Sequence, residues 1–455
     1  MVKRAEVKSR YNAPVIERLF RLSEHKTTVR TEIVAGLTTF LAMAYIIFVQ
    51  PTVLGSAGMD FGAVLVATCL ASALATVLMG VMANYPIAIA PAMGHNFYFV
   101  FAVVVGMKVP WPIALGGVFI AGAIFVLTAG FGLREKLITA IPDSLKHAIA
   151  AGIGLLIALI GLEWAGFVIG APGTLVALGP FKGAPVLLAL FGLVVMAALL
   201  ARRTAGALLL GMAATTVAGL ATGVLQFQGV FSAPPSLAPT LMKLDVVGAL
   251  QPAMAPVIAI FFFLALFDSV GTLVGVAGQA GLMRGRELPR AREALLADAA
   301  GTVAGAVLGT STVTAYVESA TGVSAGGRTG LANMVTASLF LAAIFCAPLV
   351  KMIGGGYALG NGVVLYPVIA PALILVGTMM MPGVRAIAWD DPTEGIPAFL
   401  TILVMPLAVS ITDGIAFGFI SYASLKLVTG RAREAHWLVH LSAALFVVRY
   451  AFLAR

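Results

Sequence analysis

Charged residues are scarce in this sequence. Asp, Glu, Lys and Arg make up 10% of its 455 residues, whereas hydrophobic residues make up 60% and the mean hydropathy is +1.04. This composition excludes a soluble globular protein and predicts an all-α polytopic membrane protein. Because a membrane helix needs about 20 apolar residues, the chain has room for about a dozen or more spans.

Residues that bind metals and phosphates are also rare. The chain has two cysteines and five histidines, and it shows neither a cluster of metal ligands nor a glycine-rich phosphate-binding loop. We therefore predict no cofactor and no metal. Cys69 and Cys346 lie in apolar stretches, where buried cysteines are usual. The net charge of +9 is explained by the anionic membrane surface, so no nucleic-acid partner is predicted.

A signal peptide is not evident at the N-terminus. Residues 1–30 carry eight Lys or Arg and lack a long apolar run, so they are predicted to form a cytoplasmic segment. Within it, Ala13 to Glu24 has apolar residues on roughly one side of a helix. This pattern fits a segment lying on the inner leaflet, and a solvated basic tail fits equally well.

Hydropathy predicts fourteen spans in two sets of seven. The first set lies near residues 31–54, 62–83, 86–106, 112–131, 145–163, 183–201 and 204–225. A Pro-rich loop separates it from the second set, near residues 250–280, 290–308, 310–328, 331–350, 362–382, 394–411 and 413–429.

The basic residues support this count independently. With the N-terminus inside, the outer segments hold only Lys108, Lys182, Lys243 and Lys351, and the remaining Lys and Arg, among them Arg134, Lys136, Arg284 and Arg286, fall inside. This predicts a multi-pass protein of the cytoplasmic membrane with both termini in the cytoplasm. The stretch Trp437 to Leu453, interrupted by His440 and Arg449, is predicted to be an interfacial helix.

Seven spans per half meet the condition for an inverted repeat. We divide the chain into the first repeat at 31–225, an extracytoplasmic loop at 226–246, the second repeat at 247–429 and a C-terminal interfacial segment at 430–455. Tyr45 precedes His95 by 50 residues, and Asp268 precedes Glu318 by 50 residues. One offset of 223 residues therefore superposes spans one and three on spans eight and ten.

Spans three and ten do not resemble ordinary membrane helices. Gly309 to Gly330 begins with β-prone residues and continues with small ones, and Tyr85 to Asn96 is again an extended run followed by a helix start. Irregular backbone at membrane depth survives only where protein or a water-filled cavity satisfies it, and its free N–H groups can face a ligand. We predict a binding site at these two segments.

Two carboxylates are candidates for that site. Asp268 lies about midway along span eight and Glu318 lies at the break in span ten, and no Lys or Arg is expected at their depth. They can be a proton-carrying pair, acceptors for substrate N–H groups, or both. Asp298, which follows Arg290 and Arg292, is predicted to have a structural role.

The third span contributes His95, Asn96 and Phe97. Asn96 can read the polar edge of a heterocycle, and Phe97 can stack on its face, although packing is an equally good explanation for Phe97. A proton relay and a structural hydrogen bond are equally plausible for His95. Val317 and Ser319 flank Glu318, and backbone N–H groups near Phe97 and Ser319 are predicted to face substrate acceptors.

Two further patterns carry less weight. Gly322 to Gly326 has the form GxSxG, with Ser324 as its serine, but no strand-to-helix elbow in a soluble domain surrounds it, so an enzyme is not predicted. Asp391 to Glu394 has the order of residues found at a helix start, and a capping role is predicted.

The sequence resembles the AzgA-like hypoxanthine/guanine/adenine permeases, a branch of the nucleobase:cation symporter superfamily. The resemblance covers about Thr31 to Thr429. It rests on TEIVAGLTTFLAMAYIIFVQP, ANYPIAIAPAMGHNFYF, FFFLALFDSVGTLVG, TSTVTAYVESATGVSAGGRTGLA, DDPTEGIPAFLTILVMPL and GIAFGFISY.

This resemblance implies a uracil-permease-like fold, with a core domain moving against a gate domain and short β-strands in spans three and ten. Asp268 and Glu318 match the acidic substrate ligands, Phe97 matches the aromatic residue packed on the base, and Asn96 matches a polar position of the purine branch. Thr272 falls where uracil transporters place a residue important to proton coupling. His95 departs from the pattern, which usually has an apolar residue there.

The sequence therefore predicts a proton-coupled importer of purine nucleobases, with H+ as coupling ion, the lipid bilayer as surroundings and a possible homodimer. A symporter of the same fold for uracil, xanthine or an inorganic anion is the alternative, and anions are disfavoured by two acids without a cation. An intramembrane hydrolase using Ser324 and a passive channel are further alternatives. The preferred purine, adenine, guanine or hypoxanthine, is not determined by the sequence.

Overall fold

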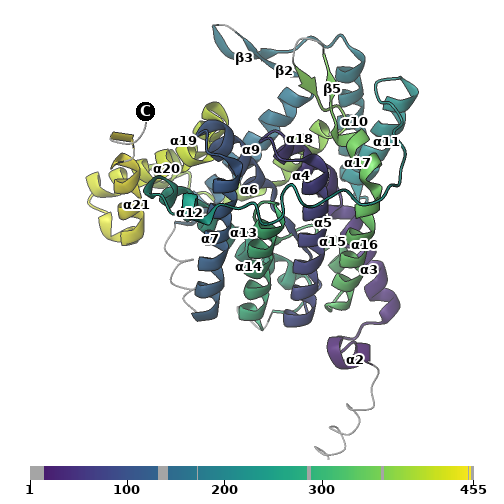
Figure 1. Ribbon diagram of the computed structural model, residues 1–455. Coiled ribbons are helices and arrows are strands. Elements are labelled where there is room, and N and C mark those ends of the chain that lie inside the picture. The colour runs from purple at the N-terminus through teal and green to yellow at the C-terminus, as the bar shows by residue number, and fades with distance from the viewer. Residues whose placement is uncertain are drawn as a thin grey trace, which may run out of the picture.

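The computed structural model describes residues 15–131, 142–171, 173–283, 288–359, 363–448 and 450–451. Most of the predicted N-terminal segment, together with Arg134, Lys136, Arg284, Arg286 and Arg449, lies outside these ranges. The described chain is mostly helical, and eight of its helices are long and apolar enough to cross a membrane. A polytopic helical membrane fold is thus confirmed (Figure 1).

The first half of the chain forms nine described helices that follow the predicted spans closely. They are α2 (Val15–Phe20), α3 (Val29–Met43), α4 (Ile46–Gly55), α5 (Phe61–Leu78), α6 (Met93–Phe97), α7 (Trp111–Phe131), α9 (Asp143–Trp164), α10 (Ala184–Ala201) and α11 (Ala207–Ala221). Two π-helical segments, Met79–Ala83 and Tyr98–Gly106, extend α5 and α6.

The second half begins with the short α12 (Val246–Ala249). Its other helices are α13 (Ala255–Gln279), α14 (Ala291–Leu308), α15 (Ser319–Ser324), α16 (Leu331–Ala343), α17 (Ala347–Gly354), α18 (Ala370–Met379), α19 (Pro392–Ala408), α20 (Ile411–Val428) and α21 (Trp437–Val448). The predicted helix start at Asp391 is confirmed, because its side chain accepts a hydrogen bond of 2.9 Å from the Thr393 N–H.

The two predicted strands are present and pair with each other. β1 (Ile89–Pro91) and β4 (Val313–Ala315) form a two-stranded antiparallel sheet in which Ala90 faces Thr314. Two hairpins not predicted from the sequence are β2 (Val168–Ala171) with β3 (Thr174–Leu178), and β5 (Tyr357–Ala358) with β6 (Val364–Leu365). The buried pair β1–β4 thus brings residues from the two halves of the chain into contact.

The helices form two groups. We call the first the strand group: α3 to α7 and α12 to α17 pack around β1 and β4, with close contacts between α7 and α14 and between α3 and α16. We call the second the flanking group: α9 to α11 and α18 to α21, joined by contacts of α9 with α18 and α19. In Figure 1 the yellow helices α19 to α21 lie beside the upper part of α7, and the strand group extends below them.

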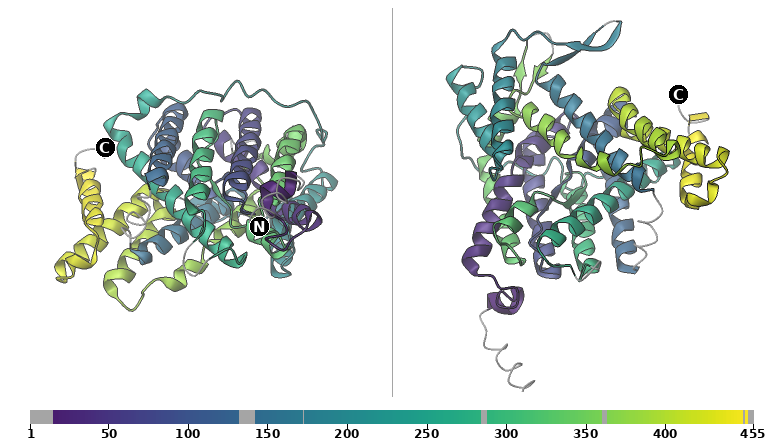
Figure 2. Two further views of the ribbon diagram at one scale, coloured as in Figure 1. Left: turned by 90° about the horizontal axis from the view of Figure 1, so that it is seen from below. Right: turned by 180° about the vertical axis from the view of Figure 1, so that it is seen from behind.

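A long segment without regular structure links the groups. Residues 222–245, which we call the strap, leave α11 and cross the ends of the strand-group helices before α12 (Figures 1 and 2). Backbone hydrogen bonds join Ser232 to Phe345, Met242 to Val307 and Asp245 to Pro112, at 2.8 to 2.9 Å. The strap is therefore fastened to the ends of α7 and α14 and to the junction between α16 and α17.

Gly309 should be intolerant of any side chain because of the strap. Its φ is +96°, and an added Cβ would lie 2.2 Å from the Thr240 Cβ. We expect Gly309→Ala to lower stability by about 2 kcal/mol more than Gly58→Ala, measured as the apparent Tm of the purified protein. Gly58 is a matched control, because its φ is +80° and nothing lies within 4 Å of the added atom. Equal decreases in Tm for the two variants would contradict this prediction and show that the strap moves to accommodate the added atom.

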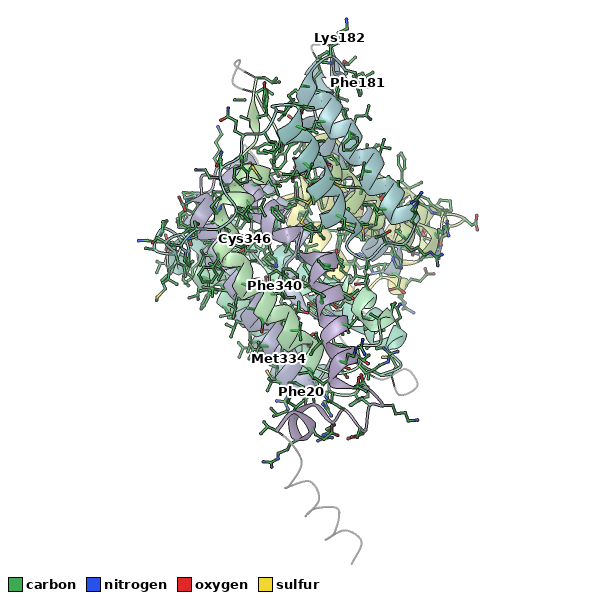
Figure 3. All side chains as sticks on the ribbon, turned by 90° about the vertical axis from the view of Figure 1, so that its right-hand side faces the viewer. Phe20, Phe181, Lys182, Met334, Phe340 and Cys346 are labelled. Atoms are coloured by element: carbon green, nitrogen blue, oxygen red, sulfur yellow. The ribbon has the colours of Figure 1, made fainter. Side chains whose placement is uncertain are left out.

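Different contacts stabilise the two ends of the molecule. At one end, Phe20 and Leu22 are buried against Leu331, and Figure 3 shows Phe20 near Met334 at the lower end of α16. At the opposite tip, Figure 3 shows Phe181 and Lys182, which follow the β2–β3 hairpin. The Phe181 ring stacks on Phe167 with centroids 5.3 Å apart, so this hairpin is anchored at its base.

The C-terminal helix α21 packs along α20. The Phe419 and Phe446 rings meet edge to face with centroids 6.3 Å apart, and the Tyr450 hydroxyl donates to Asp413 Oδ1 at 2.6 Å. Asp413 lies in the first turn of α20, so the two helices run antiparallel. The interfacial position predicted for α21 stays a prediction.

A cluster of charges joins the other end of α20 to the start of α19. Lys426 lies 3.0 Å from Glu394 and 2.9 Å from Glu434, and Arg431 lies 2.8 Å from Asp391. Hydrogen bonds from Thr393 lower the pKa of Asp391 to about 2, and those from Arg431 and Lys426 lower the pKa of Glu434 to about 2. Asp391 and Glu434 therefore stay ionised far below neutral pH.

Candidate functional site

The paired strands β1 and β4 place the candidate site between the two halves of the chain. Hydroxyl groups hold both strands in position. Thr76 Oγ1 accepts from the Ile89 N–H at 2.9 Å and donates to the Ile89 carbonyl at 3.0 Å, and Thr302 donates to the Val313 carbonyl at 2.7 Å. Each strand is followed closely by a short helix, α6 or α15, as the extended-then-helical sequence pattern predicts.

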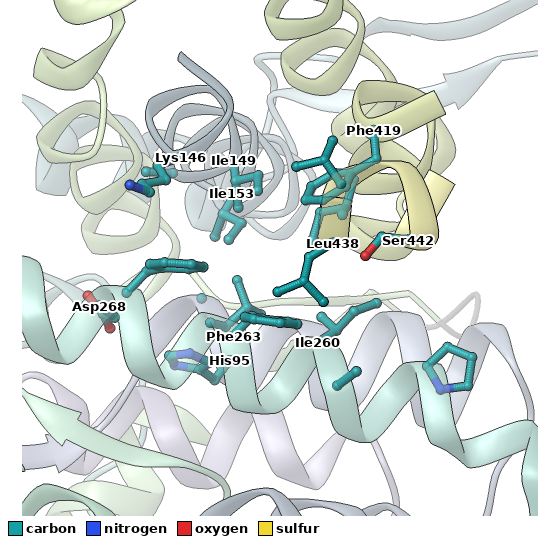
Figure 4. Close-up of a pocket in the computed structure, with 18 of the residues that line it drawn as sticks. His95, Lys146, Ile149, Ile153, Ile260, Phe263, Asp268, Phe419, Leu438 and Ser442 are labelled. Carbon is teal, nitrogen blue, oxygen red and sulfur yellow. The ribbon is translucent and has the colours of Figure 1, made fainter. Parts of the chain in front are cut away.

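A cavity of about 780 Å³ lies between the strand group and the flanking group. On the strand-group side it is lined by α13 and by Gly94 and His95 of α6, and on the other side by α9, α20 and α21 (Figure 4). Its wall is mostly apolar, and its polar lining residues are His95, Lys146, His147, Asp268, Thr272 and Ser442. A volume of this size accommodates a small organic molecule.

Asp268 reaches the cavity directly, and Glu318 lies nearby. The Asp268 side chain is exposed and lines the cavity, whereas Glu318 is half-buried and is not part of the lining. The helix that carries Asp268, α13, packs against α15, which begins directly after Glu318. The Tyr45 hydroxyl donates to Glu318 Oε1 at 2.7 Å, so one of the two acids already has a protein partner.

His95 and Thr272 also line the cavity. His95 is 3% exposed, and neither of its ring nitrogens makes a hydrogen bond within the described ranges. Figure 4 shows its ring beside α13, on the same side of the cavity as Asp268. Thr272 lies one helical turn after Asp268 and is half-buried. The structure thus brings together His95, Asp268 and Thr272, and their predicted roles in binding and coupling stay predictions.

Asn96 faces away from the cavity. Its side chain donates to Gln50 and accepts from Ser311, and Gln50 Nε2 donates to Ser311 Oγ at 3.1 Å. Gln50 Nε2 also donates to Thr310 Oγ1 at 2.8 Å. This buried polar ring joins α4, α6 and the residues before β4. In this structure Asn96 therefore binds neighbouring protein groups and is not open to a ligand.

Phe97, Val317 and Ser319 are not among the lining residues either. The Phe97 ring is fully buried and stacks on Phe101 with centroids 5.5 Å apart. The Ser319 hydroxyl accepts from the Ala88 N–H at 3.0 Å, and its own N–H donates to the Tyr316 carbonyl at 3.1 Å. Val317 is 56% exposed. Contact of these residues with a substrate stays a prediction.

Lys146 corrects the expectation that no cation lies at the depth of the acids. It lines the cavity, its Nζ lies 5.7 Å from the centroid of the Phe267 ring, and Phe267 directly precedes Asp268 (Figure 4). The same Nζ donates to Asp143 Oδ1 at 2.8 Å. The sequence placed Lys146 at the end of a span, and only the fold shows that α9 and α13 line the same cavity.

Asp298 has contacts that agree with the predicted structural role. It is fully buried, accepts from the Ala315 N–H at 2.7 Å and also accepts from the Ser269 hydroxyl. Ser269 in turn lies 2.9 Å from Thr314 Oγ1. Asp298 therefore ties β4 to α13, next to Asp268. Among the described residues, no group of three or more His, Cys, Asp or Glu is arranged to hold a metal ion.

A helical membrane domain in which two broken segments cross beside a cavity with an accessible carboxylate defines a membrane transporter. The fold resembles that of the transmembrane domain of the cyanobacterial bicarbonate transporter BicA, with a TM-score of 0.62 at 12% identity over 86% of this chain and 97% of that one. The sequence profile of the Permease family matches residues 30–417, and the chain belongs to this family.

Characterised relatives match along nearly the whole chain. The adenine permease AdeP of Escherichia coli is 43% identical, over 96% of both chains. The guanine/hypoxanthine permease PbuG of Bacillus subtilis is 45% identical, over 95% of this chain and 99% of its own. The resemblance to nucleobase permeases predicted from the sequence is confirmed, and the protein is a transporter and not an enzyme.

Proposed function

We propose that this protein imports purine nucleobases across the cytoplasmic membrane together with protons. The relatives are named for adenine and for guanine and hypoxanthine, which supports a purine substrate. The observation that carries the proposal is the accessible carboxylate of Asp268 in the cavity, with Glu318 just before α15, which packs against α13. Two acids at this depth can accept purine ring N–H groups and can also carry a proton.

The proposed binding mode follows from hydrogen-bond chemistry. Purine N–H groups donate to the carboxylates of Asp268 and Glu318, and protonation favours the loaded state. A hydrogen bond to a charged group contributes about 1.5 to 3 kcal/mol, so the loss of one should weaken binding about tenfold or more. Transport then requires the strand group, as the core, to move past the flanking group, as the gate.

The finer architecture is also part of the proposal. We infer fourteen spans in two inverted halves of seven, with both termini in the cytoplasm. The alternating strands and helices of the two halves support this, since β1 with α6 and β4 with α15 have the same order. A homodimer in the bilayer is proposed from the fold resemblance.

The decisive test is uptake into proteoliposomes with an inward proton gradient. We expect accumulation of radiolabelled adenine, guanine or hypoxanthine by the wild type and its loss in Glu318→Gln, because the amide can neither carry the proton nor accept at both positions. Glu163→Gln is the matched control, since Glu163 is exposed on α9 and outside the cavity lining.

Three results would contradict this assignment. Accumulation of uracil alone would refute the purine substrate. Uptake that survives collapse of the gradient and never exceeds the external concentration would indicate a passive channel. A folded protein that moves no base at all would refute the site. Asp391 and Glu434 remain ionised throughout the pH range of such assays, so they are not the source of a pH effect.

The cation of Lys146 in the cavity lining is the one observation that favours the alternative function, transport of an inorganic anion. If the cavity binds a neutral purine, the charge of Lys146, already paired with Asp143, is not required. We then expect Lys146→Met to change the KM for purines by less than about threefold, as for a partly exposed ion pair. An anion carrier would instead lose uptake in Lys146→Met and keep it in Lys146→Arg. Competition by bicarbonate or another inorganic anion, measured alongside, separates the two.

A further inference from the structure

Tyr45 is the side chain that connects the first span to the candidate site. It lies between α3 and α4, where the helix is interrupted, and is 1% exposed. Its hydroxyl donates to Glu318 Oε1 at 2.7 Å, across a sequence separation of 273 residues. Two roles fit a phenol in this position. It can be a packing residue that contacts Glu318 incidentally, or it can fix the orientation of the Glu318 carboxyl group.

The surroundings of Glu318 favour the second role, in which Tyr45 fixes the orientation of its carboxyl group. No other side chain in the described ranges donates a hydrogen bond to its carboxylate, and no Lys or Arg there forms an ion pair with it. The residue immediately precedes α15, at the end of the irregular segment that follows β4. Tyr45 is therefore the described side chain that fixes the orientation of this carboxyl group.

The chemistry of a carboxyl group gives this contact a consequence. With Oε1 occupied by the phenol, Oε2 is the oxygen left to accept a substrate N–H or to take up a proton. A carboxyl group held by one oxygen presents the other in one orientation, which reduces the entropy lost on binding. Without the phenol, the two oxygens become equivalent and the group can rotate.

The repeat places Tyr45 in a meaningful position. Tyr45 precedes His95 by the same 50 residues that separate Asp268 from Glu318, so Tyr45 is the repeat equivalent of Asp268. The second half thus supplies a free acid to the cavity, and the first half supplies a phenol at the matching position. The two acids therefore have different surroundings. The Asp268 carboxylate lines the cavity, and the Glu318 carboxylate is hydrogen-bonded to Tyr45.

We propose that Tyr45 is a positioning residue that holds Oε1 of Glu318 and so directs Oε2 toward the purine. The proposal rests on the proposed function for the identity of the ligand. It assigns no contact between Tyr45 and the substrate. The effect of removing the phenol should therefore fall on substrate affinity and leave the rate at saturation nearly unchanged.

Tyr316 provides a matched control. It is also a buried tyrosine, 5% exposed, close to the β1–β4 pair, and its hydroxyl donates to the Pro91 carbonyl at 2.5 Å. Tyr316→Phe removes a neighbouring phenol that interacts with the Tyr45 hydroxyl but makes no hydrogen bond to Glu318 itself. A purely structural effect of losing a buried phenol should therefore appear in both variants.

The first arm is purine uptake kinetics in proteoliposomes for the wild type, Tyr45→Phe and Tyr316→Phe. We expect the KM to rise by up to about tenfold in Tyr45→Phe, with kcat within about twofold, because the freed carboxyl group has to be ordered when the purine binds. Tyr316→Phe should keep the wild-type KM. An unchanged KM in Tyr45→Phe, or an equal rise in both variants, would overturn the proposal.

The second arm needs no substrate. Infrared difference spectra of wild type minus Glu318→Gln identify the carboxyl band of Glu318 in the purified protein. Tyr45→Phe should shift this band, because a hydrogen bond to Oε1 is lost, and Tyr316→Phe should not. If the wild type moves no purine, the proposed function fails and the band still decides the role of Tyr45. If the wild type transports purines but the band does not move, the inference alone fails.

Discussion

Asp268→Asn is expected to abolish purine accumulation. Asp268 is the acid of the predicted pair that is exposed to the cavity, at the middle of α13. Asparagine has nearly the same shape, but it replaces one acceptor oxygen by a donor and cannot take up a proton. Loss of a charged hydrogen bond alone should weaken binding about tenfold or more, and loss of proton coupling should remove accumulation against a gradient.

The measurement is gradient-driven uptake of a radiolabelled purine, with binding measured separately by thermal stabilisation of the purified protein. Asp390→Asn makes the same chemical change at an exposed turn before α19, outside the cavity lining, and should behave as the wild type. Full accumulation by Asp268→Asn would refute its role. Normal binding without accumulation would assign Asp268 to coupling alone.

Asp298→Ala is expected to destabilise the protein by about 3 kcal/mol. The change leaves the Ala315 N–H and the Ser269 hydroxyl buried without the acceptor they now share. Leaving a buried donor unsatisfied is expensive, more so when its partner was an acid. Because Ala315 belongs to β4, the loss should also disturb the strand pair beside the site. The apparent Tm of purified protein should fall by several degrees.

Asp298→Asn is the matched variant. Its amide oxygen can still accept from the Ala315 N–H, and its amide nitrogen can donate to Ser269, so stability should recover largely. Uptake by Asp298→Asn then tests for a role in transport independently of stability. A folded Asp298→Asn protein with no uptake would contradict the structural role, because it would require the acid itself.

The fold was predictable wherever periodicity and hydropathy decide the structure. The segment Gly309 to Gly330 is predicted to begin extended and to change at Glu318, and the structure has β4 before Glu318 and α15 directly after it. Residue preferences and turn chemistry are local, so they can be read from the sequence. The hairpins β2–β3 and β5–β6 were missed because short strands outside the spans lack a comparable pattern.

The site was less predictable, because the position of a residue along a membrane span does not specify which way its side chain points. Asn96 follows a strand in a segment that suggested ligand contact, yet its amide completes a ring with Gln50 and Ser311. Gln50 lay in an apolar run without any sign of a distant partner. Lys146 was misjudged because the span boundary was taken as the depth of its ammonium group, and α9 carries it to the cavity instead.

The strap has a practical consequence for following the transport cycle. Because it is hydrogen-bonded to Phe345, Val307 and Pro112, it shares the displacement of the helices beneath it. Its exposed residue Ser236 is therefore a place for a spectroscopic reporter that follows the strand group without entering it. A second reporter on the exposed Leu175 of the β2–β3 hairpin would follow the flanking group. A reporter on the strap can therefore detect the movement of the strand group relative to the flanking group without a label on the helices themselves.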